Sequence, residues 1–272
     1  QVIDYTYEFW SEIIASEIGK ALGLDILHYD VAKRGNKLGC LSKSMIDPQK
    51  EALQEGYKWL TGFEEEYDIK DKEAYTFQII ERLLTSKFPK EGFIYNIIKI
   101  IVFDCIIGNE DRHQENWSIV VSNKLVDRNK LFRKKQTVTE TTYSFAPIYD
   151  NGSSMGRELT DERVAKMLKD NMQLEAYIKR GKSEIHWEGE KGKQKHLDLI
   201  TKVANSGYRE KVIEIIASIR SKYQDNILIE IINNIDNCLP KDCLSQKNPK
   251  IRKDFWIKLV SLRIKKLFEL RL

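Results

Sequence analysis

The stretch Gly108-Asn109-Glu110-Asp111-Arg112-His113-Gln114-Glu115-Asn116-Trp117 gathers acidic, basic and amide side chains in one short segment. An apolar run, residues 93–107, precedes it, and a short β-branched run, residues 117–121, follows it. A polar loop between a buried helix and a buried strand is well placed for chemistry, because the rigid elements hold its geometry. We therefore expect the rest of the chain to be organised around this loop.

The composition is that of an ordinary globular protein. The chain has 272 residues, 42% of them hydrophobic and 32% charged, which is enough for one large domain or two lobes with a core. The net charge is 45 − 41 = +4, which could favour an anionic ligand but is too small to indicate nucleic-acid binding. These numbers argue against a disordered chain and against direct binding to nucleic acid.

The sequence predicts a cytoplasmic protein with no membrane association. No signal peptide is visible at Gln1, and the missing initiator Met suggests that the chain begins inside a longer protein. The longest apolar run, residues 93–107, carries polar residues and is too short to span a bilayer. Cys40 and Cys105 lie among apolar residues and suit small core positions, whereas the spacing of Cys238 and Cys243 disfavours zinc.

Two parts can be distinguished along the chain. Residues 7–22 predict an amphipathic helix, with Gly23 at its end, and residues 26–33 and 37–46 flank Gly35-Asn36 as in a β-hairpin. Pro48 interrupts this pattern, and we place the boundary between residues 47 and 48. The prediction is a partial N-terminal lobe over residues 1–47 and a mainly helical C-terminal lobe over residues 48–272.

The second part combines several helices with two short strands. The strands are expected at residues 117–121 and 143–148, and the basic segment 122–142 between them suggests an exposed hairpin or a flexible insertion. Residues 182–188 suggest an extended piece. Helices are predicted over residues 50–60, 73–84, 91–107, 158–169, 196–205, 208–221, 225–235 and 254–272. The last of these is basic and amphipathic, and packing on the lobe is favoured over a membrane or partner role.

The polar loop contains the parts of a phosphoryl-transfer site. Asp111 and Asn116 lie five residues apart, and Asp150 follows the next pair of strands. One acid can orient a hydroxyl group, while an Asn and a second Asp hold magnesium against nucleotide phosphates. Protein kinases have the same Asp-to-Asn spacing in their catalytic loop. Asp and Asn are also common in ordinary loops. A metal-dependent phosphohydrolase that uses Asp111, His113 and Asp150 is a further alternative. The small number of His residues in the chain disfavours it.

The surrounding residues resemble a known family. Asn109-Glu110-Asp111-Arg112-His113-Gln114-Glu115-Asn116 resembles the Asn-x-Asp-x-His-x-x-Asn loop of HipA-like serine/threonine kinases, to which the loop of phosphoinositide kinases is related. Ala146-Pro147-Ile148-Tyr149-Asp150-Asn151-Gly152-Ser153-Ser154 resembles the segment that replaces Asp-Phe-Gly in that family. Weaker similarity covers residues 9–12, 18–23, 103–108 and 177–183. The resemblance implies an α+β, two-lobed protein-kinase-like fold with a truncated small N-terminal lobe.

The resemblance also implies roles for individual residues. Asp111 would be the catalytic base or hydroxyl-orienting acid, with Asn116 and Asp150 as magnesium ligands. His113 is expected to support the loop rather than carry a proton, and Arg112 to brace the loop by pairing with an acid. The remaining predicted positions bind ATP: Glu12 would pair with a nucleotide-binding lysine, and Ser44, Met45, Ile46 and Asp47 would form the hinge that meets adenine.

One departure from the family pattern affects the expected activity. The phosphate-covering loop and the strand lysine should precede Glu12, but only eleven residues do, and none is a lysine or part of a Gly-rich run. Since both features contact the phosphates, we expect weak nucleotide binding and little turnover from residues 1–272. The main alternative to an ATP- and magnesium-dependent kinase is therefore a catalytically impaired pseudokinase that binds a protein.

The expected partners also follow from the resemblance. A HipA-like kinase would phosphorylate a protein substrate, and the chain could be the toxin of a toxin–antitoxin pair with a small DNA-binding antitoxin as partner. The sequence itself identifies neither the phosphoacceptor nor the antitoxin.

Overall fold

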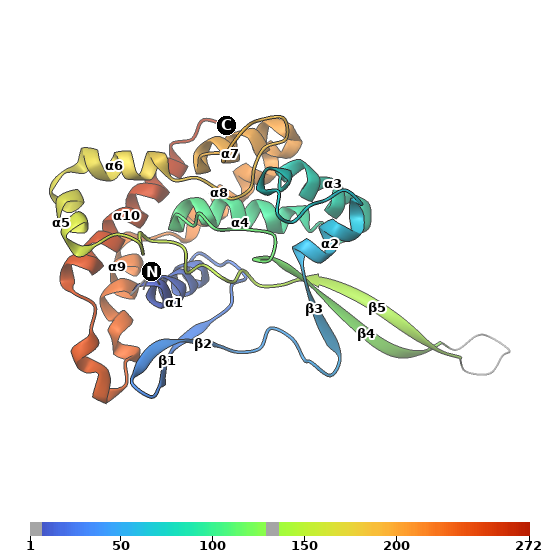
Figure 1. Cartoon of the computed structure of the whole chain (residues 1–272), viewed down its shortest axis with the longest axis horizontal. Coiled ribbons are helices and arrows are strands. Elements are labelled where there is room, and N and C mark those ends of the chain that lie inside the picture. Colours follow the sequence, from blue (N-terminus) through green and yellow to red (C-terminus); the bar gives the residue numbers. More distant parts are fainter. Residues whose placement is uncertain (1–6, 129–135) are drawn as a thin grey trace.

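The computed structural model describes residues 7–128 and 136–272. A smaller part contains α1 (Glu8–Ala21) and the antiparallel hairpin of β1 (Tyr29–Arg34) and β2 (Lys37–Ser42) (Figure 1). A larger part follows, with a three-stranded antiparallel sheet and most of the helices. Its sheet has the order β3 (Glu51–Glu55), β4 (Ser118–Arg128) and β5 (Gln136–Phe145).

The helices of the larger part surround α4, which runs through its middle (Figure 1). Helix α4 spans Ile94–Ile107, and the other helices of this part are α2 (Gly56–Phe63), α3 (Phe77–Lys87), α5 (Asp161–Lys169), α6 (Asn171–Arg180), α7 (His196–Val203), α8 (Arg209–Lys222), α9 (Asp225–Asn234) and α10 (Lys250–Phe268). Short turns of 3₁₀- or π-helix are η1 (Lys72–Ala74), η2 (Ala204–Tyr208), η3 (Ile235–Cys238) and η4 (Lys241–Gln246). None of the described helices is both long and apolar enough to cross a bilayer.

The predictions for the two central helices are confirmed. The helix α1 buries Trp10, Ile14 and Ile18, and it ends where Gly23 adopts a φ of +70°, a conformation that glycine adopts without a steric penalty. The apolar residues of α4 are buried on nearly all sides, since other helices cover it. Asp104 is the one polar residue of α4 that is buried. A carboxylate in this position needs a partner, which the next loop supplies.

The prediction of one helix over residues 50–60 is wrong in its first half. Residues Glu51–Glu55 form β3, which pairs with β4 in the register Glu51↔Ser122 to Glu55↔Ser118, and only then does α2 begin. The predicted strands at residues 117–121 and 143–148 are parts of the longer β4 and β5. The predicted extended piece at residues 182–188 forms only the isolated bridges Lys182↔Lys195 and Thr76↔His186.

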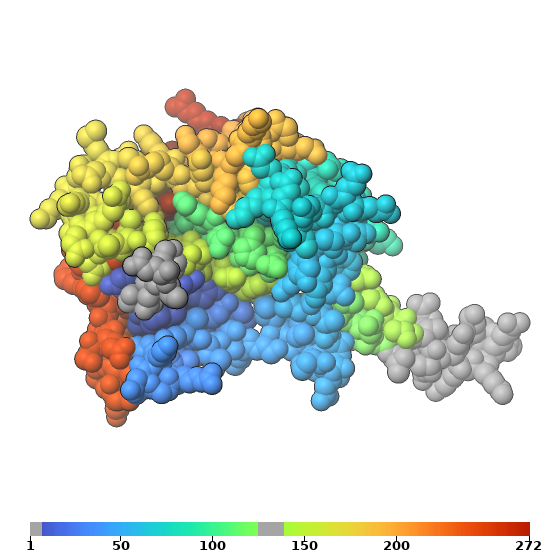
Figure 2. All heavy atoms as spheres, viewed as in Figure 1, coloured from blue at the N-terminus to red at the C-terminus, as the bar shows by residue number. Residues whose placement is uncertain are grey.

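The basic segment between the two strands belongs to a hairpin, as one of the two alternatives predicted. The strands β4 and β5 pair from Ile119↔Phe145 to Arg128↔Gln136 and project away from the helical body (Figures 1 and 2). Residues 129–135, which also belong to the predicted insertion, lie outside the described residues.

The start of α2 is fixed by contact with the end of the polar loop. Gly56 donates its N–H to Trp117 O, and a Cβ at Gly56 would lie 2.2 Å from Trp117 Cε2 and 2.8 Å from Gln114 O. Substitution Gly56→Ala is therefore expected to lower the free energy of unfolding by about 1–3 kcal/mol, because a buried indole and a backbone carbonyl must move. Chemical denaturation measures the loss.

The same helix provides a matched control. A Cβ at Gly62 would meet no atom within 4 Å, and Gly62 is exposed. We expect Gly62→Ala to be neutral or to stabilise the protein by up to about 1 kcal/mol, as alanine favours a helix over glycine. Equal effects of the two substitutions would contradict the close packing of Gly56 on Trp117.

Candidate functional site

The polar loop begins where α4 ends in a left-handed turn. Gly108 has a φ of +71°, and the N–H groups of Gly108 and Asn109 both donate to Asp104 O, at 2.8 and 3.0 Å. Glycine suits this position because a side chain there would be strained and would meet Arg263 Nη2 at 2.6 Å. The end of α4 therefore sets the direction in which the loop leaves the helix.

Arg112 is the residue that holds the loop together. Its side chain is fully buried, and its Nε and Nη2 donate to the two carboxylate oxygens of Asp104 at 3.1 and 2.9 Å. Nη1 donates to Asn116 O at 2.9 Å and also to Tyr149 O, and Nη2 donates to Asn151 Oδ1 at 2.7 Å. The prediction that Arg112 braces the loop by pairing with an acid is confirmed. One guanidinium joins α4, the loop and the segment after β5.

The two predicted functional residues of the loop are in direct contact. Asn116 Nδ2 donates to the backbone carbonyl of Asp111 at 2.8 Å, so its Oδ1 remains available to a ligand. The Asp111 carboxylate is half-buried and accepts a hydrogen bond from Ser153 Oγ at 3.3 Å, and Asp111 N–H donates to Asn109 Oδ1. This arrangement presents one carboxylate and one amide oxygen from a rigid turn.

The side chain of His113 makes contacts within the polar loop. Its Nδ1 accepts a hydrogen bond from the Glu115 N–H at 3.2 Å and lies 3.6 Å from the Glu115 carboxylate. Both contacts lie within the loop, so the ring stabilises the turn between Asp111 and Asn116. This geometry fits the predicted supporting role of His113.

Asp150 is presented by an unusual backbone conformation. Its φ is +55°, one of two positive values among the described non-glycine residues, and aspartate is among the residues that tolerate this region. The carboxylate is exposed and makes no hydrogen bond or ion pair with the rest of the described chain. Its backbone N–H points to the Tyr29 hydroxyl at 3.5 Å. A strained, unpaired acid next to the loop is available to a cation.

Glu12 connects α1 to the Asp150 segment. Its Oε2 accepts a hydrogen bond from the backbone N–H of Asn151, and its side chain is buried. Burial raises the pKa of Glu12 to about 7, and the nearby Asp150 carboxylate adds to this, whereas hydrogen bonds from Tyr29 and the Asn151 N–H oppose it. No described lysine forms an ion pair with Glu12.

A pocket of about 480 Å³ adjoins Glu12 and Asp150. Its other walls include Tyr29, Cys40 and Gly152, so it lies between α1, the hairpin of β1 and β2, and the segment after β5. Cys40 is only half-buried because it faces this pocket, whereas Cys105 is buried as predicted. A cavity of this size suits a small-molecule ligand.

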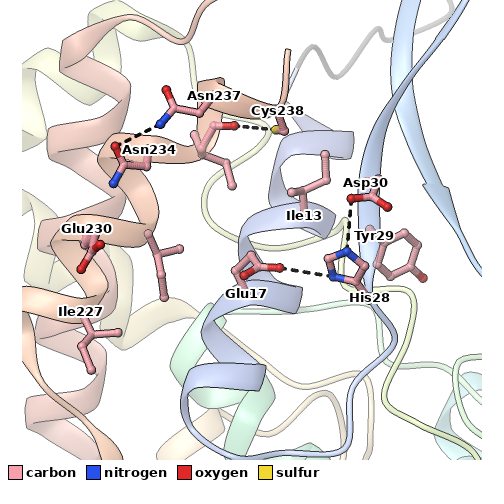
Figure 3. A pocket seen from close by; sticks show the side chains of 12 residues that line it. Ile13, Glu17, His28, Tyr29, Asp30, Ile227, Glu230, Asn234, Asn237 and Cys238 are labelled. Carbon is pink, nitrogen blue, oxygen red and sulfur yellow. Dashed lines mark hydrogen bonds and ion pairs between the residues drawn. The ribbon is translucent and has the colours of Figure 1, made fainter. Parts of the chain in front are cut away.

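A second pocket, of about 420 Å³, lies beside another face of α1, between Glu17 and the α9 residues Glu230 and Asn234 (Figure 3). His28 bridges Glu17 and Asp30 at its wall, at 3.3 and 3.2 Å. None of the predicted site residues lines this pocket. The predicted site residues Glu12 and Asp150 line the pocket of about 480 Å³ instead.

The four residues predicted to meet adenine lie in the connection from β2 to β3. Ser44 Oγ donates to Ile46 O at 2.7 Å, and Asp47 Oδ1 accepts from the Gln49 N–H at 3.1 Å, which with Lys50 lowers the pKa of the exposed Asp47. Met45 and Ile46 are half-buried. The segment connects β2 to β3, and both the lobe boundary placed there and its contact with adenine stay predictions.

The structure brings Asp111, Asn116, Asp150 and Glu12 together through partners that sequence reasoning did not assign. Asp104 balances Arg112, and Asn151 links Arg112 to Glu12. An acid inside the apolar run 93–107 was the available signal for Asp104, because a buried carboxylate implies a partner. No sequence signal pointed to Tyr29.

Comparison with known proteins identifies the fold. No family model and no curated protein matches the sequence. The structure is similar to that of CtkA, a Helicobacter pylori proinflammatory kinase, with a TM-score of 0.74 and 20% identity over 97% of this chain and 81% of CtkA. The chain has a HipA-like kinase fold.

A second similar structure is HipA of the Shewanella oneidensis MR-1 toxin–antitoxin system, solved with HipB and operator DNA. The TM-score is 0.55 with 12% identity, and the alignment covers 99% of this chain but only 59% of that HipA. The α+β kinase-like fold predicted from the sequence is thus confirmed.

Proposed function

We propose that this chain is an ATP- and magnesium-dependent phosphotransferase that acts on a serine or threonine hydroxyl of a protein. The observation that carries the proposal is the Arg112 network, which joins the Asp111–Asn116 loop to Tyr149 and Asn151 on either side of Asp150. These residues match the division of labour in kinases between a hydroxyl-orienting acid and metal-holding side chains.

The residues present fit a magnesium ion. Asn116 Oδ1 and the Asp150 carboxylate are hard oxygen donors, and neither is occupied by a described cation. Magnesium prefers one or two protein oxygens together with phosphate and water oxygens, and when bound it would neutralise charge on the phosphates. The described residues contain no group of three or more His, Cys, Asp or Glu side chains arranged for a metal, so no observation favours the phosphohydrolase alternative.

The chain's own groups would act on the acceptor hydroxyl. The Asp111 carboxylate, held through its backbone by Asn109 and Asn116, would orient the hydroxyl and accept its proton. The hydroxyl oxygen would bond to the γ-phosphorus as the bond between that phosphorus and the departing ADP oxygen breaks. Ser153 Oγ, which donates to Asp111, would keep the carboxylate in position.

A pseudokinase that binds a protein is the second candidate. The observation in its favour is that Glu12 bonds to the Asn151 backbone and has no described lysine partner. In an active kinase this acid pairs with the nucleotide-binding lysine. The proposed partners are a protein substrate and, by analogy with the HipA structure solved with HipB and operator DNA, a DNA-binding antitoxin.

An ATP titration with and without magnesium tests the proposal. We expect magnesium to strengthen ATP binding, and Asp150→Asn to remove most of this gain, because the amide replaces a charged oxygen ligand. Calorimetry gives the two dissociation constants. Glu115→Gln, which makes the same charge change at an exposed position of the polar loop, should keep the magnesium dependence.

The outcomes separate the candidates. Magnesium-dependent ATP binding together with protein phosphorylation supports the kinase, and binding without phosphorylation supports the pseudokinase. Two equalities would contradict both the metal site and the kinase proposal. They are an ATP affinity of the wild type that does not change with magnesium, and an equal ATP affinity in Asp150→Asn.

A further inference from the structure

A small basic pocket shares no lining residue with the pocket at Glu12 and Asp150. It measures about 170 Å³ and lies where the end of α6, the start of α7, and α10 approach α4. Its lining includes four basic side chains, Lys179, Lys195, Arg263 and Lys266, against one carboxylate, Asp198. Lys266 also pairs with Glu175 at 3.6 Å, outside the lining. The remaining positive charge favours an anion.

Arg263 is the unusual member of this pocket. It is 3% exposed, and its one hydrogen bond among the described residues is from Nη1 to Cys105 O at 3.3 Å. Its Nε is buried without a hydrogen-bond partner, and no described carboxylate lies within 4 Å of the guanidinium. Burial raises the pKa of the nearby Glu110 carboxyl and the Arg263 charge opposes this, but that carboxylate accepts its hydrogen bond from the Lys182 N–H, at 3.3 Å. A buried guanidinium normally has an anionic partner.

The start of α7 adds further donors to the pocket. The helix begins at His196 after Lys195, with no side-chain cap. The His196 N–H donates to Gly181 O at 3.4 Å, and the next described backbone hydrogen bond is from the Leu199 N–H to Lys195 O. The N–H groups of Leu197 and Asp198, two residues that line the pocket, therefore lack protein partners in the described chain. Free N–H groups at a helix N-terminus bind anions.

His196 lines the pocket with a polar but uncharged ring. It is 3% exposed, and its Nε2 has no hydrogen-bond partner. Burial lowers the pKa of His196 to about 3, and the Arg263 charge adds to this, so the ring is neutral at physiological pH. A neutral ring beside a buried arginine can donate one N–H to an oxyanion.

We propose that this pocket binds a tetrahedral oxyanion, either free phosphate or the phosphoryl group of a phosphorylated residue. Arg263 lies at its base, Lys179 and Lys195 stand at its exposed rim, and the N-terminus of α7 completes the donor set. The volume of about 170 Å³ suits a phosphoryl group but is smaller than the roughly 300–1,000 Å³ typical of pockets for larger ligands. The buried Arg263 and the N-terminus of α7 thus bind the same anion.

The pocket adjoins the catalytic loop. Arg263 bonds to Cys105 O in the last turn of α4, and a Cβ at Gly108 would lie 2.6 Å from Arg263 Nη2. A Cβ at Gly181 would lie 3.0 Å from the same atom and 3.3 Å from Glu110 Oε1. An anion bound to Arg263 would therefore stabilise the region from which the catalytic loop begins.

Phosphate titration tests the proposal. With inorganic phosphate against chloride at equal ionic strength, we expect saturable binding by calorimetry and a rising thermal midpoint. The double variant Lys179→Gln/Lys195→Gln should weaken phosphate binding about tenfold or more, since two charge-assisted contacts at the rim are lost. Arg263→Gln should abolish it. The two lysines are exposed, so the double variant remains informative if Arg263→Gln does not fold.

A matched control separates the pocket from general charge effects. Arg180→Gln/Lys265→Gln removes the same charge from exposed neighbours outside the pocket and should leave the phosphate affinity unchanged. Asp150→Asn should also leave it unchanged, so the result is independent of the proposed kinase activity. Equal phosphate binding by the pocket variant and the control, or no saturable binding by the wild type, would overturn the proposal.

O-phosphoserine, with serine as its control, distinguishes the two sources of the ligand. Binding of O-phosphoserine at least as tight as that of phosphate, and lost in the double variant, assigns the pocket to a phosphorylated residue. Binding of phosphate alone assigns it to the free anion. Binding of neither compound would overturn the proposal.

Discussion

Replacing Arg112 with methionine is expected to lower the free energy of unfolding by about 3–5 kcal/mol, the cost of breaking a buried ion pair from one side. Arg112 is fully buried and forms a bidentate pair with Asp104, which is also buried. Methionine has a similar length but no donors, so it leaves the Asp104 carboxylate and the carbonyls of Asn116 and Tyr149 without their partner. Chemical denaturation followed by circular dichroism measures the loss.

The control is Arg82→Met. Arg82 pairs with Glu188 at 3.0 Å on the surface, where both side chains are about half exposed, and such pairs contribute about 0–1 kcal/mol to stability.

The Arg112→Met variant should also depend on pH. Burial raises the pKa of Asp104 and Arg112 opposes this, so without Arg112 the pKa of Asp104 should rise further. The variant should then recover stability relative to the wild type as the pH falls and Asp104 is protonated. If Arg112→Met lowered the free energy of unfolding by less than about 1 kcal/mol at neutral pH, the bracing role of Arg112 would be contradicted.

Replacing Asp111 with asparagine is expected to reduce phosphoryl transfer by about 10²–10⁴-fold, the range for losing a general base. The substitution keeps the shape of the side chain and leaves an oxygen that can accept from Ser153 Oγ, so the fold should be retained. Because turnover of residues 1–272 is expected to be low, the assay is transfer of labelled γ-phosphate to a protein acceptor under single-turnover conditions.

Glu115→Gln is the control for this substitution as well. It removes one negative charge from an exposed position four residues further along the same loop. If the loss in Asp111→Asn arose from the net charge of the loop alone, both variants would lose activity equally. Unchanged transfer in Asp111→Asn, with ATP binding intact, would remove Asp111 from the reaction.

The sequence predicted the elements whose pattern is local. The apolar run 93–107 predicts a buried helix, because periodic apolar side chains must all be covered, and α4 is buried. The spacing of Asp111 and Asn116 in one turn also depends only on nearby residues, and the structure joins them by a hydrogen bond. Gly23 and the Gly35-Asn36 pair likewise mark the end of α1 and the hairpin.

The exception at residues 51–55 shows where local patterns fail. The sequence Glu-Ala-Leu-Gln-Glu has a high helix propensity, yet it forms β3 because its backbone pairs with β4, about 65 residues away. Propensities differ by less than about 1 kcal/mol per residue, so pairing with a distant strand and packing on its neighbours can outweigh them.

The sequence by itself determined which functional groups are present and in what order. These are Asp111 and Asn116 in one loop and Asp150 after the next strands, with a kinase-like order of elements around them. What only the tertiary structure decided was how these groups are held. The Arg112 guanidinium joins three segments, the Asn151 N–H binds Glu12 to the segment that carries Asp150, and Arg263 is buried beside the α7 N-terminus. Such contacts join residues as far as 158 positions apart. They form because a charge removed from water must find partners wherever the fold places them, and residue order alone does not specify those partners.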